Sequence, residues 1–164
     1  MKQLIIVRHA KSSWGNVELS DHDRPIKDIG VIKTDKVIKF LKDESVNPDL
    51  IMTSTAVRAY GTAKLIADGI GYNSENIEKR KTLYHAGEDD IYDELFSINN
   101  SINSVMLVAH NPTLTGFVNN FISPKIDNLP TTGVVCIEFK THSWENIGDA
   151  KFKVKFVIFP QMLP

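Results

Sequence analysis

Apolar residues follow two kinds of pattern along the chain. Three short continuous runs, Leu4–Val7, Asp49–Met52 and Val105–Ala109, are typical of strands that are buried on both faces of a sheet. Elsewhere the apolar residues are spaced by three and four positions, as on one side of an amphipathic helix. This spacing predicts helices over Ile29–Leu41, Thr55–Ile70, Glu88–Ile102 and the stretch from Asn111 to Ile122.

Residues at the ends of two of these segments strengthen the prediction. Asn111 is a good N-cap, and Pro112 suits the first helical position because that position needs no N–H donor. Thr55 can cap the second helix, and Gly69 or Gly71 can end it. Both helices are therefore expected to begin directly after a strand.

The last part of the chain has a different pattern. Val134–Phe139 and Phe152–Phe159 are strand-like, and the second alternates apolar residues with lysines. Strands that alternate with helices predict a three-layer α/β/α fold with a mostly parallel central sheet, and we expect the last strands to lie antiparallel at an edge. No repeat or linker-like stretch interrupts the sequence, so residues 1–164 are expected to form one domain.

Composition narrows the classes of function. Nineteen Lys and Arg residues stand against 20 Asp and Glu, a formal charge of −1 that argues against a broad cationic surface for nucleic acid. The single cysteine, Cys136, excludes an internal disulfide and a Cys-rich zinc cluster. No apolar run approaches the ~20 residues that cross a bilayer, and Leu4–Val7 is too short for the core of a signal peptide. We therefore expect a cytoplasmic enzyme or binding domain without a nucleic-acid or membrane partner.

Polar and charged residues follow each of the three apolar runs. Arg8 and His9 follow the first run, Arg58 lies just after the second, and His110 follows the third. Ligands of open α/β sheets bind beyond the carboxyl ends of the strands, so these side chains converge if the strands are neighbours. Guanidinium groups and free helix N–H groups bind phosphate oxygens, and a neutral imidazole can attack phosphorus. The residues that follow the three runs, 8–13, 53–58 and 110–113, include no carboxylate, so the sequence predicts a positive pocket for a phosphoryl group.

The ordered set of motifs resembles the histidine phosphatase superfamily, which has the phosphoglycerate mutase-like fold. Arg8–Ala10 is similar to its Arg-His-Gly signature, Ser54–Ala63 to its second arginine motif, and Ala109–Pro112 to its second histidine motif. The similarity covers nearly the whole chain. Three further stretches, residues 23–26, 83–86 and 129–133, resemble the compact SixA-like phosphohistidine phosphatases.

The resemblance implies a role for each of these residues. His9 would be the nucleophile and would carry a phosphohistidine intermediate. Arg8, Arg58 and His110 would bind the phosphoryl oxygens and stabilise charge during transfer, and Ser12 would add a hydroxyl donor. Water would then hydrolyse the phosphoenzyme, and the resemblance implies no metal, nucleotide or other cofactor.

The proton donor of the wider family has no clear counterpart. Glu88 and Asp89 are the candidates, although acidic residues also suit the first turn of a helix. Acid help matters little for an imidazole leaving group but is worth about 10²–10⁴-fold for an alkoxide. The sequence therefore favours a phosphohistidine-bearing signalling protein as substrate. A small phosphorylated metabolite, and a non-catalytic role in binding phosphate or a phosphoprotein, stay open as alternatives.

Overall fold

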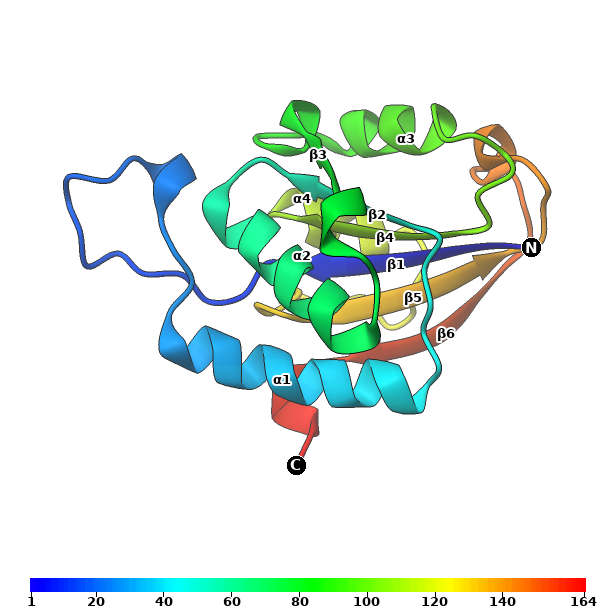
Figure 1. Cartoon of the computed structure of the whole chain (residues 1–164). Helices are drawn as coiled ribbons and strands as arrows, with labels where there is room; N and C mark the ends of the chain where they lie inside the picture. The colour runs from blue at the N-terminus through cyan, green and yellow to red at the C-terminus, as the bar shows by residue number, and fades with distance from the viewer.

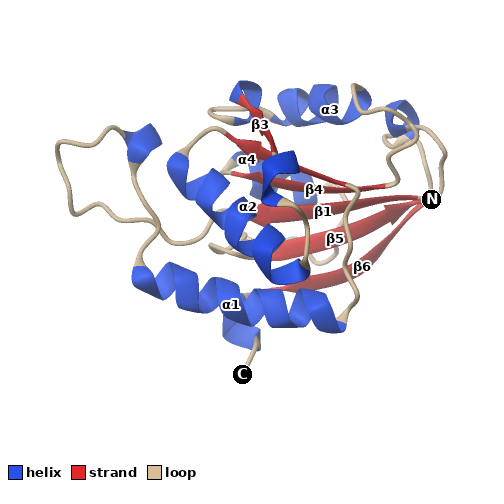
Figure 2. Ribbon diagram, in the orientation of Figure 1, coloured by secondary structure: helices blue, strands red, loops and turns tan.

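The frame of the molecule is a six-stranded sheet, described by a computed structural model that covers residues 1–164. In chain order the strands are β1 (Lys2–Arg8), β2 (Leu50–Ser54), β3 (Glu78–Arg80), β4 (Ser104–Ala109), β5 (Val134–Phe139) and β6 (Phe152–Ile158). Across the sheet their order is β3-β2-β4-β1-β5-β6 (Figures 1 and 2). The α-helices are α1 (Asp28–Asp43), α2 (Val57–Ile70), α3 (Glu88–Phe96) and α4 (Thr113–Val118).

The sheet is mixed in the way that the sequence predicts. β1, β4, β2 and β3 run parallel, whereas β5 is antiparallel to β1 and to β6. This confirms an α/β fold with a mostly parallel sheet and antiparallel strands at one edge. β3 was not predicted, because its three residues are all charged and it lies at the other edge, where no apolar run is needed.

Helices cover both faces of the sheet (Figure 2). Alternate residues of β1 show the division: Ile5 and Val7 belong to one buried cluster with α1 and α2, and Leu4 and Ile6 belong to another with α3 and α4. Side chains on both faces of the central strands are thus removed from water. This explains why β1, β2 and β4 are continuous apolar runs rather than alternating ones.

Two predicted helices are shorter than their apolar spacing suggested. α3 ends at Phe96 rather than Ile102, and α4 ends at Val118 rather than Ile122. After α3 the chain turns, and the buried ammonium of Lys2 binds this turn through the carbonyl oxygens of Asn100 and Ile102 at 2.6 and 3.0 Å. The apolar residues beyond each helix still pack in the core, so hydrophobic spacing alone did not mark where the helices end.

The residues that cap the N-termini of α2 and α4 differ from the predicted ones. Ser54, not Thr55, binds the free backbone before α2: its hydroxyl oxygen accepts from the Ala56 N–H at 3.2 Å. Gly71 follows the last residue of α2 and caps it, and its φ of 84° is a left-handed conformation that favours glycine. At the start of α4 the N-cap is Pro112, so Asn111 precedes the cap position that was predicted for it. The Asn111 Oδ1 still accepts from the Thr115 N–H at 3.1 Å.

The carboxyl ends of β1, β2 and β4 lie side by side because these three strands are neighbours. At the same end of the sheet, the segment from β1 to α1 projects from the molecule (Figure 1). Its base is fixed by the bridge between Ser12 and Ile26 and by the Lys27 N–H, which donates to the Lys11 carbonyl oxygen at 2.8 Å.

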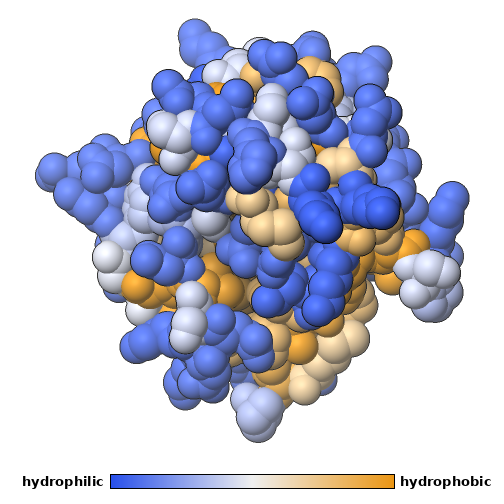
Figure 3. All heavy atoms as spheres, turned by 90° about the vertical axis from the view of Figure 1, so that its right-hand side faces the viewer, coloured by the Kyte–Doolittle hydropathy of each residue, from blue (hydrophilic) through white to orange (hydrophobic).

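Apolar side chains form a band on the surface around the N-terminus, with hydrophilic side chains on either side (Figure 3). None of the helices combines the length and the apolar character that crossing a membrane requires.

Candidate active site

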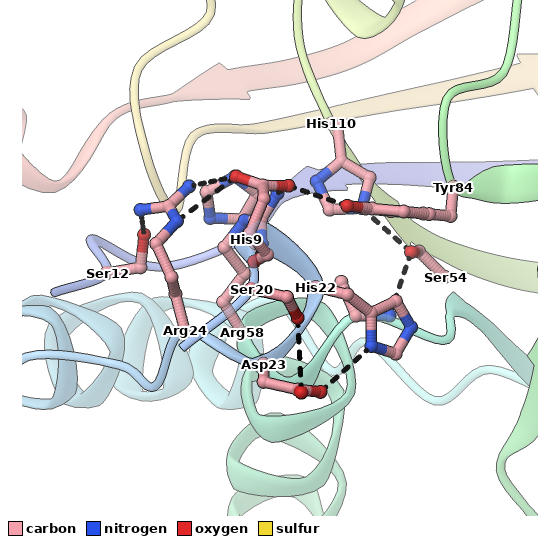
Figure 4. A network of polar contacts seen from close by, with 12 residues as sticks. His9, Ser12, Ser20, His22, Asp23, Arg24, Ser54, Arg58, Tyr84 and His110 are labelled. Atoms are coloured by element: carbon pink, nitrogen blue, oxygen red, sulfur yellow. Dashed lines mark hydrogen bonds and ion pairs between the residues drawn. The ribbon is translucent and has the colours of Figure 1, made fainter. Parts of the chain in front are cut away.

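The structure brings four of the predicted residues together at the carboxyl ends of the strands. Arg8 and His9 come from the end of β1, His110 follows β4, and Arg58 lies in the first turn of α2. All four line one cavity of about 760 Å³. The ring centroids of His9 and His110 are 5.1 Å apart, and Figure 4 shows these rings facing the same space as Arg58.

His9 is held in one orientation by backbone contacts. It is 7% exposed, and its Nδ1–H donates to the Ala10 carbonyl oxygen at 2.8 Å. Because Nδ1 carries the proton in this contact, Nε2 keeps its lone pair. Burial lowers the pKa of His9 to about 4, and the nearby Arg58 and Arg8 guanidiniums add to this effect. His9 is therefore a neutral imidazole with one free ring nitrogen near pH 7.

His110 is oriented by a buried hydroxyl group. Its Nε2 lies 2.7 Å from Ser54 Oγ, and this oxygen also accepts from the Ala56 N–H. The Ser54 hydroxyl proton can thus point to Nε2, which leaves His110 Nδ1–H as a donor. Burial lowers the pKa of His110 to about 3, with further contributions from His9 and Arg58.

The arginines leave part of their hydrogen-bonding capacity unused. Arg8 donates from Nη1 to the Leu129 carbonyl oxygen at 3.0 Å, and Arg58 uses both of its terminal nitrogens on Asp21. Four buried side-chain nitrogen or oxygen atoms have no hydrogen-bond partner, and three of them are Arg8 Nε, Arg58 Nε and His110 Nδ1. Leaving a buried donor unpaired costs roughly 1–3 kcal/mol, so this cavity is suited to a ligand with several acceptor oxygens.

Three further residues line the cavity and were given no role by the sequence analysis: Asp21, Arg24 and Tyr84. The carboxylate of Asp21 accepts from Arg58 Nη2 at 3.0 Å, from Arg24 Nε and Nη2 at 3.1 and 3.0 Å, and from the Tyr84 hydroxyl at 2.7 Å. This carboxylate comes from outside the three strand-end segments from which the sequence predicted a positive pocket. Asp21 comes from the segment between β1 and α1, and only the folding of this segment over the strand ends brings it to Arg58. Its proximity to Arg24 and Pro25, in a stretch with family resemblance, was the available signal.

Ser12 lies in the cavity as predicted, but its contact is with another side chain. Its hydroxyl oxygen accepts from Arg24 Nη1 at 2.7 Å. The Trp14 ring covers the same guanidinium, with 3.4 Å between the ring centroid and the guanidinium carbon. Ser12 and Trp14 together hold Arg24 at the cavity.

Glu88 is placed away from the cavity, so the structure does not support it as the proton donor. Its carboxylate accepts from Asn120 Nδ2 at 3.0 Å and packs on Gly116 of α4. A Cβ at position 116 would come within 2.7 Å of Glu88 Oε2, which shows how closely the two helices approach. Neither Glu88 nor Asp89 lines the cavity, where Asp21 is the single carboxylate.

Comparison with known proteins shows the fold and a match to a family model. Residues 4–84 match the model of the histidine phosphatase superfamily (branch 1). The solved structure of a SixA protein from Agrobacterium tumefaciens superposes with a TM-score of 0.80 at 23% identity, over 97% of this chain and 98% of that one. A protein histidine phosphatase SixA in complex with tungstate gives a TM-score of 0.81 at 18% identity, over 98% of both chains. An uncharacterized chloroplastic protein of Arabidopsis thaliana is 26% identical, over 97% of this chain and 78% of its own length. The resemblance seen in the sequence motifs is confirmed.

The lowered pKa values of the two histidines predict how stability depends on pH. The unfolded chain binds protons at these groups below pH 6.5, whereas the folded chain binds them only near pH 4 or below. The free energy of unfolding should therefore fall as pH drops from about 7 to about 5, by on the order of 1–2 kcal/mol for each histidine. Urea denaturation of the wild type and of His9→Gln at these two pH values measures the effect. The variant should lose less stability than the wild type, and an equal loss in both would contradict the placement of a neutral His9 in the folded chain.

Proposed function

We propose, on the premise that this chain belongs to the histidine phosphatase superfamily, that it hydrolyses a phosphoryl group through a covalent phosphohistidine on His9. The observation that carries the proposal is the set of unpaired buried donors, Arg8 Nε, Arg58 Nε and His110 Nδ1, on residues that share a cavity with a neutral imidazole. The peripheral oxygens of a phosphoryl group would give these donors their acceptors.

The orientation of His9 suits the first chemical step. Its Nε2 lone pair attacks phosphorus, and the bond between phosphorus and the leaving group breaks with its electron pair going to the leaving atom. The Nδ1–H keeps its hydrogen bond to the Ala10 carbonyl, so the phosphorylated ring carries a positive charge. Its positive charge makes this ring a good leaving group in the second step.

Water completes the cycle in the proposed reaction. Its oxygen attacks phosphorus, and the bond from phosphorus to Nε2 breaks with its electron pair returning to the ring. One proton of the water stays on the departing hydrogen phosphate and the other is released to solvent. His9 is then again neutral, with its proton on Nδ1.

The charges at the site favour a dianionic group. Arg8, Arg24 and Arg58 provide three positive charges, Lys11 and Lys27 add two more at the lining of the cavity, and Asp21 provides one negative charge. Preorganised donors that face the developing charge are the main source of catalysis in phosphoryl transfer. A site that only binds phosphate needs the arginines but not a buried imidazole with a free nitrogen, so the position of His9 favours catalysis over binding.

The state of Asp21 bears on the class of substrate. Burial would raise the pKa of its carboxyl group, but hydrogen bonds from Tyr84, Arg58 and Arg24 hold that pKa well below its usual range. The single carboxylate of the cavity is therefore ionised and cannot protonate an alkoxide leaving group. A phosphohistidine needs no such acid, because its ring can be protonated on the other nitrogen and leave as neutral imidazole. We therefore propose a phosphohistidine on a signalling protein as the substrate. The fold shared with SixA proteins supports this choice.

Turnover of an aryl phosphate should depend on His9. His9→Ala should lower kcat at least about 10⁴-fold, because the proposed nucleophile is lost. The matched control is His142→Ala, which removes an exposed histidine outside the cavity and should leave kcat unchanged. Circular dichroism checks that both variants fold. Equal turnover in His9→Ala and the wild type would contradict a catalytic His9, and no turnover or phosphoenzyme in the wild type would favour a binding protein.

A phosphohistidine peptide should be the preferred substrate in competition with sugar and nucleotide monophosphates. Its kcat/KM should be larger by about 10²-fold or more, because no residue of the cavity is placed to supply a carboxylic acid proton. Glu88→Gln should change neither value, since Glu88 faces α4. Preference for one of the monophosphates would favour the alternative, a phosphomonoesterase acting on a small metabolite.

A further inference from the structure

The Asp21 carboxylate uses the donors that the proposed function assigns to substrate. Arg58 Nη2 donates to its Oδ2, and Arg58 Nη1 donates to the Asp21 main-chain oxygen at 2.6 Å. Arg24 and Tyr84 also donate to this carboxylate. Each terminal nitrogen of Arg58 thus gives one of its N–H groups to Asp21, and Nε has no partner. A phosphoryl group that binds through the N–H groups turned toward Asp21 must compete with Asp21.

We propose that Asp21 is a built-in competitor for the oxyanion site, which a dianionic phosphoryl group displaces when it binds. This inference rests on the proposed function, because it takes the site around Arg58 as the place where the phosphoryl group binds. Asp21 thereby becomes a specificity-determining residue. Part of the free energy that a ligand gains by binding these arginines is spent on displacing the carboxylate. Its net affinity therefore depends on how much better than the carboxylate it binds them.

The Asp21 side chain lies outside the core, on a segment with exposed side chains. The base of this segment is held next to the sheet by the contacts of residues 11–13 with residues 25–27. Beyond this base the side chains of Trp14 and Val17 are 71% and 95% exposed, and the Asp21 side chain is itself 41% exposed. Few buried apolar contacts therefore resist a displacement of the Asp21 side chain. The neighbouring backbone stays tied to the body of the protein by His22, whose Nε2 lies 2.9 Å from Thr55 Oγ1.

Arg24 has side-chain contacts besides those to Asp21. Ser12 accepts a hydrogen bond from its Nη1, and Trp14 covers the guanidinium plane. When the carboxylate leaves, the nitrogens Nε and Nη2 of Arg24 become available at the site together with Nη2 of Arg58. Arg24 and Arg58 both donate to the Asp21 carboxylate, so their guanidinium groups face the same point (Figure 4). Displacement of the Asp21 carboxylate thus leaves several free donors at the site for a phosphoryl group.

The competition selects ligands by charge. A monoanion such as acetate replaces the carboxylate with a group of the same charge and the same number of oxygens, so it gains little. A phosphoryl dianion brings a third oxygen and a second charge, and it can also pair with the unpaired donors of Arg8 and His110. Asp21 therefore suppresses binding of monoanions more strongly than binding of phosphate.

Calorimetric titration of the full chain with inorganic phosphate, tungstate and acetate tests the inference. Asp21→Asn keeps the shape of the side chain and removes its charge, so phosphate and tungstate should bind about tenfold more tightly. Acetate should gain at least as much affinity as phosphate. The matched control is Asp23→Asn: Asp23 lies in the same turn but binds Ser20 and His22 instead of an arginine (Figure 4), and its dissociation constants should equal those of the wild type.

The outcomes separate this inference from the proposed function. Phosphate binding that is unchanged or weaker in Asp21→Asn would overturn the inference while leaving the oxyanion site intact. Absence of phosphate and tungstate binding in both the wild type and Asp21→Asn would overturn the site itself. Should Asp21→Asn fail to fold, Tyr84→Phe provides the second test. It removes one hydrogen bond from the carboxylate, and tighter tungstate binding supports the inference, whereas unchanged or weaker binding overturns it.

Discussion

The burial of guanidinium groups next to two imidazoles is the constraint on which the site depends. Positive charge and low exposure both disfavour protonation of His9 and His110, so the two rings stay neutral and keep a lone pair. The same burial leaves donors of Arg8 and Arg58 without partners. An anion stabilises a positively charged cavity with unpaired donors. In the free protein the Asp21 carboxylate is the anion that accepts from Arg58.

The fold supplies this arrangement through contacts between neighbouring elements. Thr62 in α2 accepts from the Ala10 N–H at 2.8 Å and donates to the Arg58 carbonyl oxygen at 2.7 Å, so it ties the loop after β1 to the helix that carries the arginine. The His9 N–H donates to the Ala109 carbonyl oxygen of β4 at 3.1 Å. His9 and Arg58 are therefore fixed relative to one another before any ligand binds, which is what the proposed electrostatic catalysis requires.

The parts of this architecture that depend on local pattern could be predicted from the sequence, and those that depend on tertiary placement could not. The central strands are continuous apolar runs, and the strand-end rule then places His9, Arg58 and His110 near one another. Asp21 could not be assigned, because its role arises only when its segment folds back over the strand ends. Glu88 was proposed because an acidic residue at the start of a helix looks the same whether it faces a cavity or, as here, another helix.

The most direct test of the account is the location of the phosphoryl group during turnover. The wild-type protein would be mixed with an aryl phosphate, quenched within the first turnover under alkaline conditions that preserve phosphohistidine, and mapped by peptide mass spectrometry. The account predicts a phosphorylated peptide in which the group lies on His9. Phosphate on another residue, or turnover without any phosphorylated peptide, would contradict it.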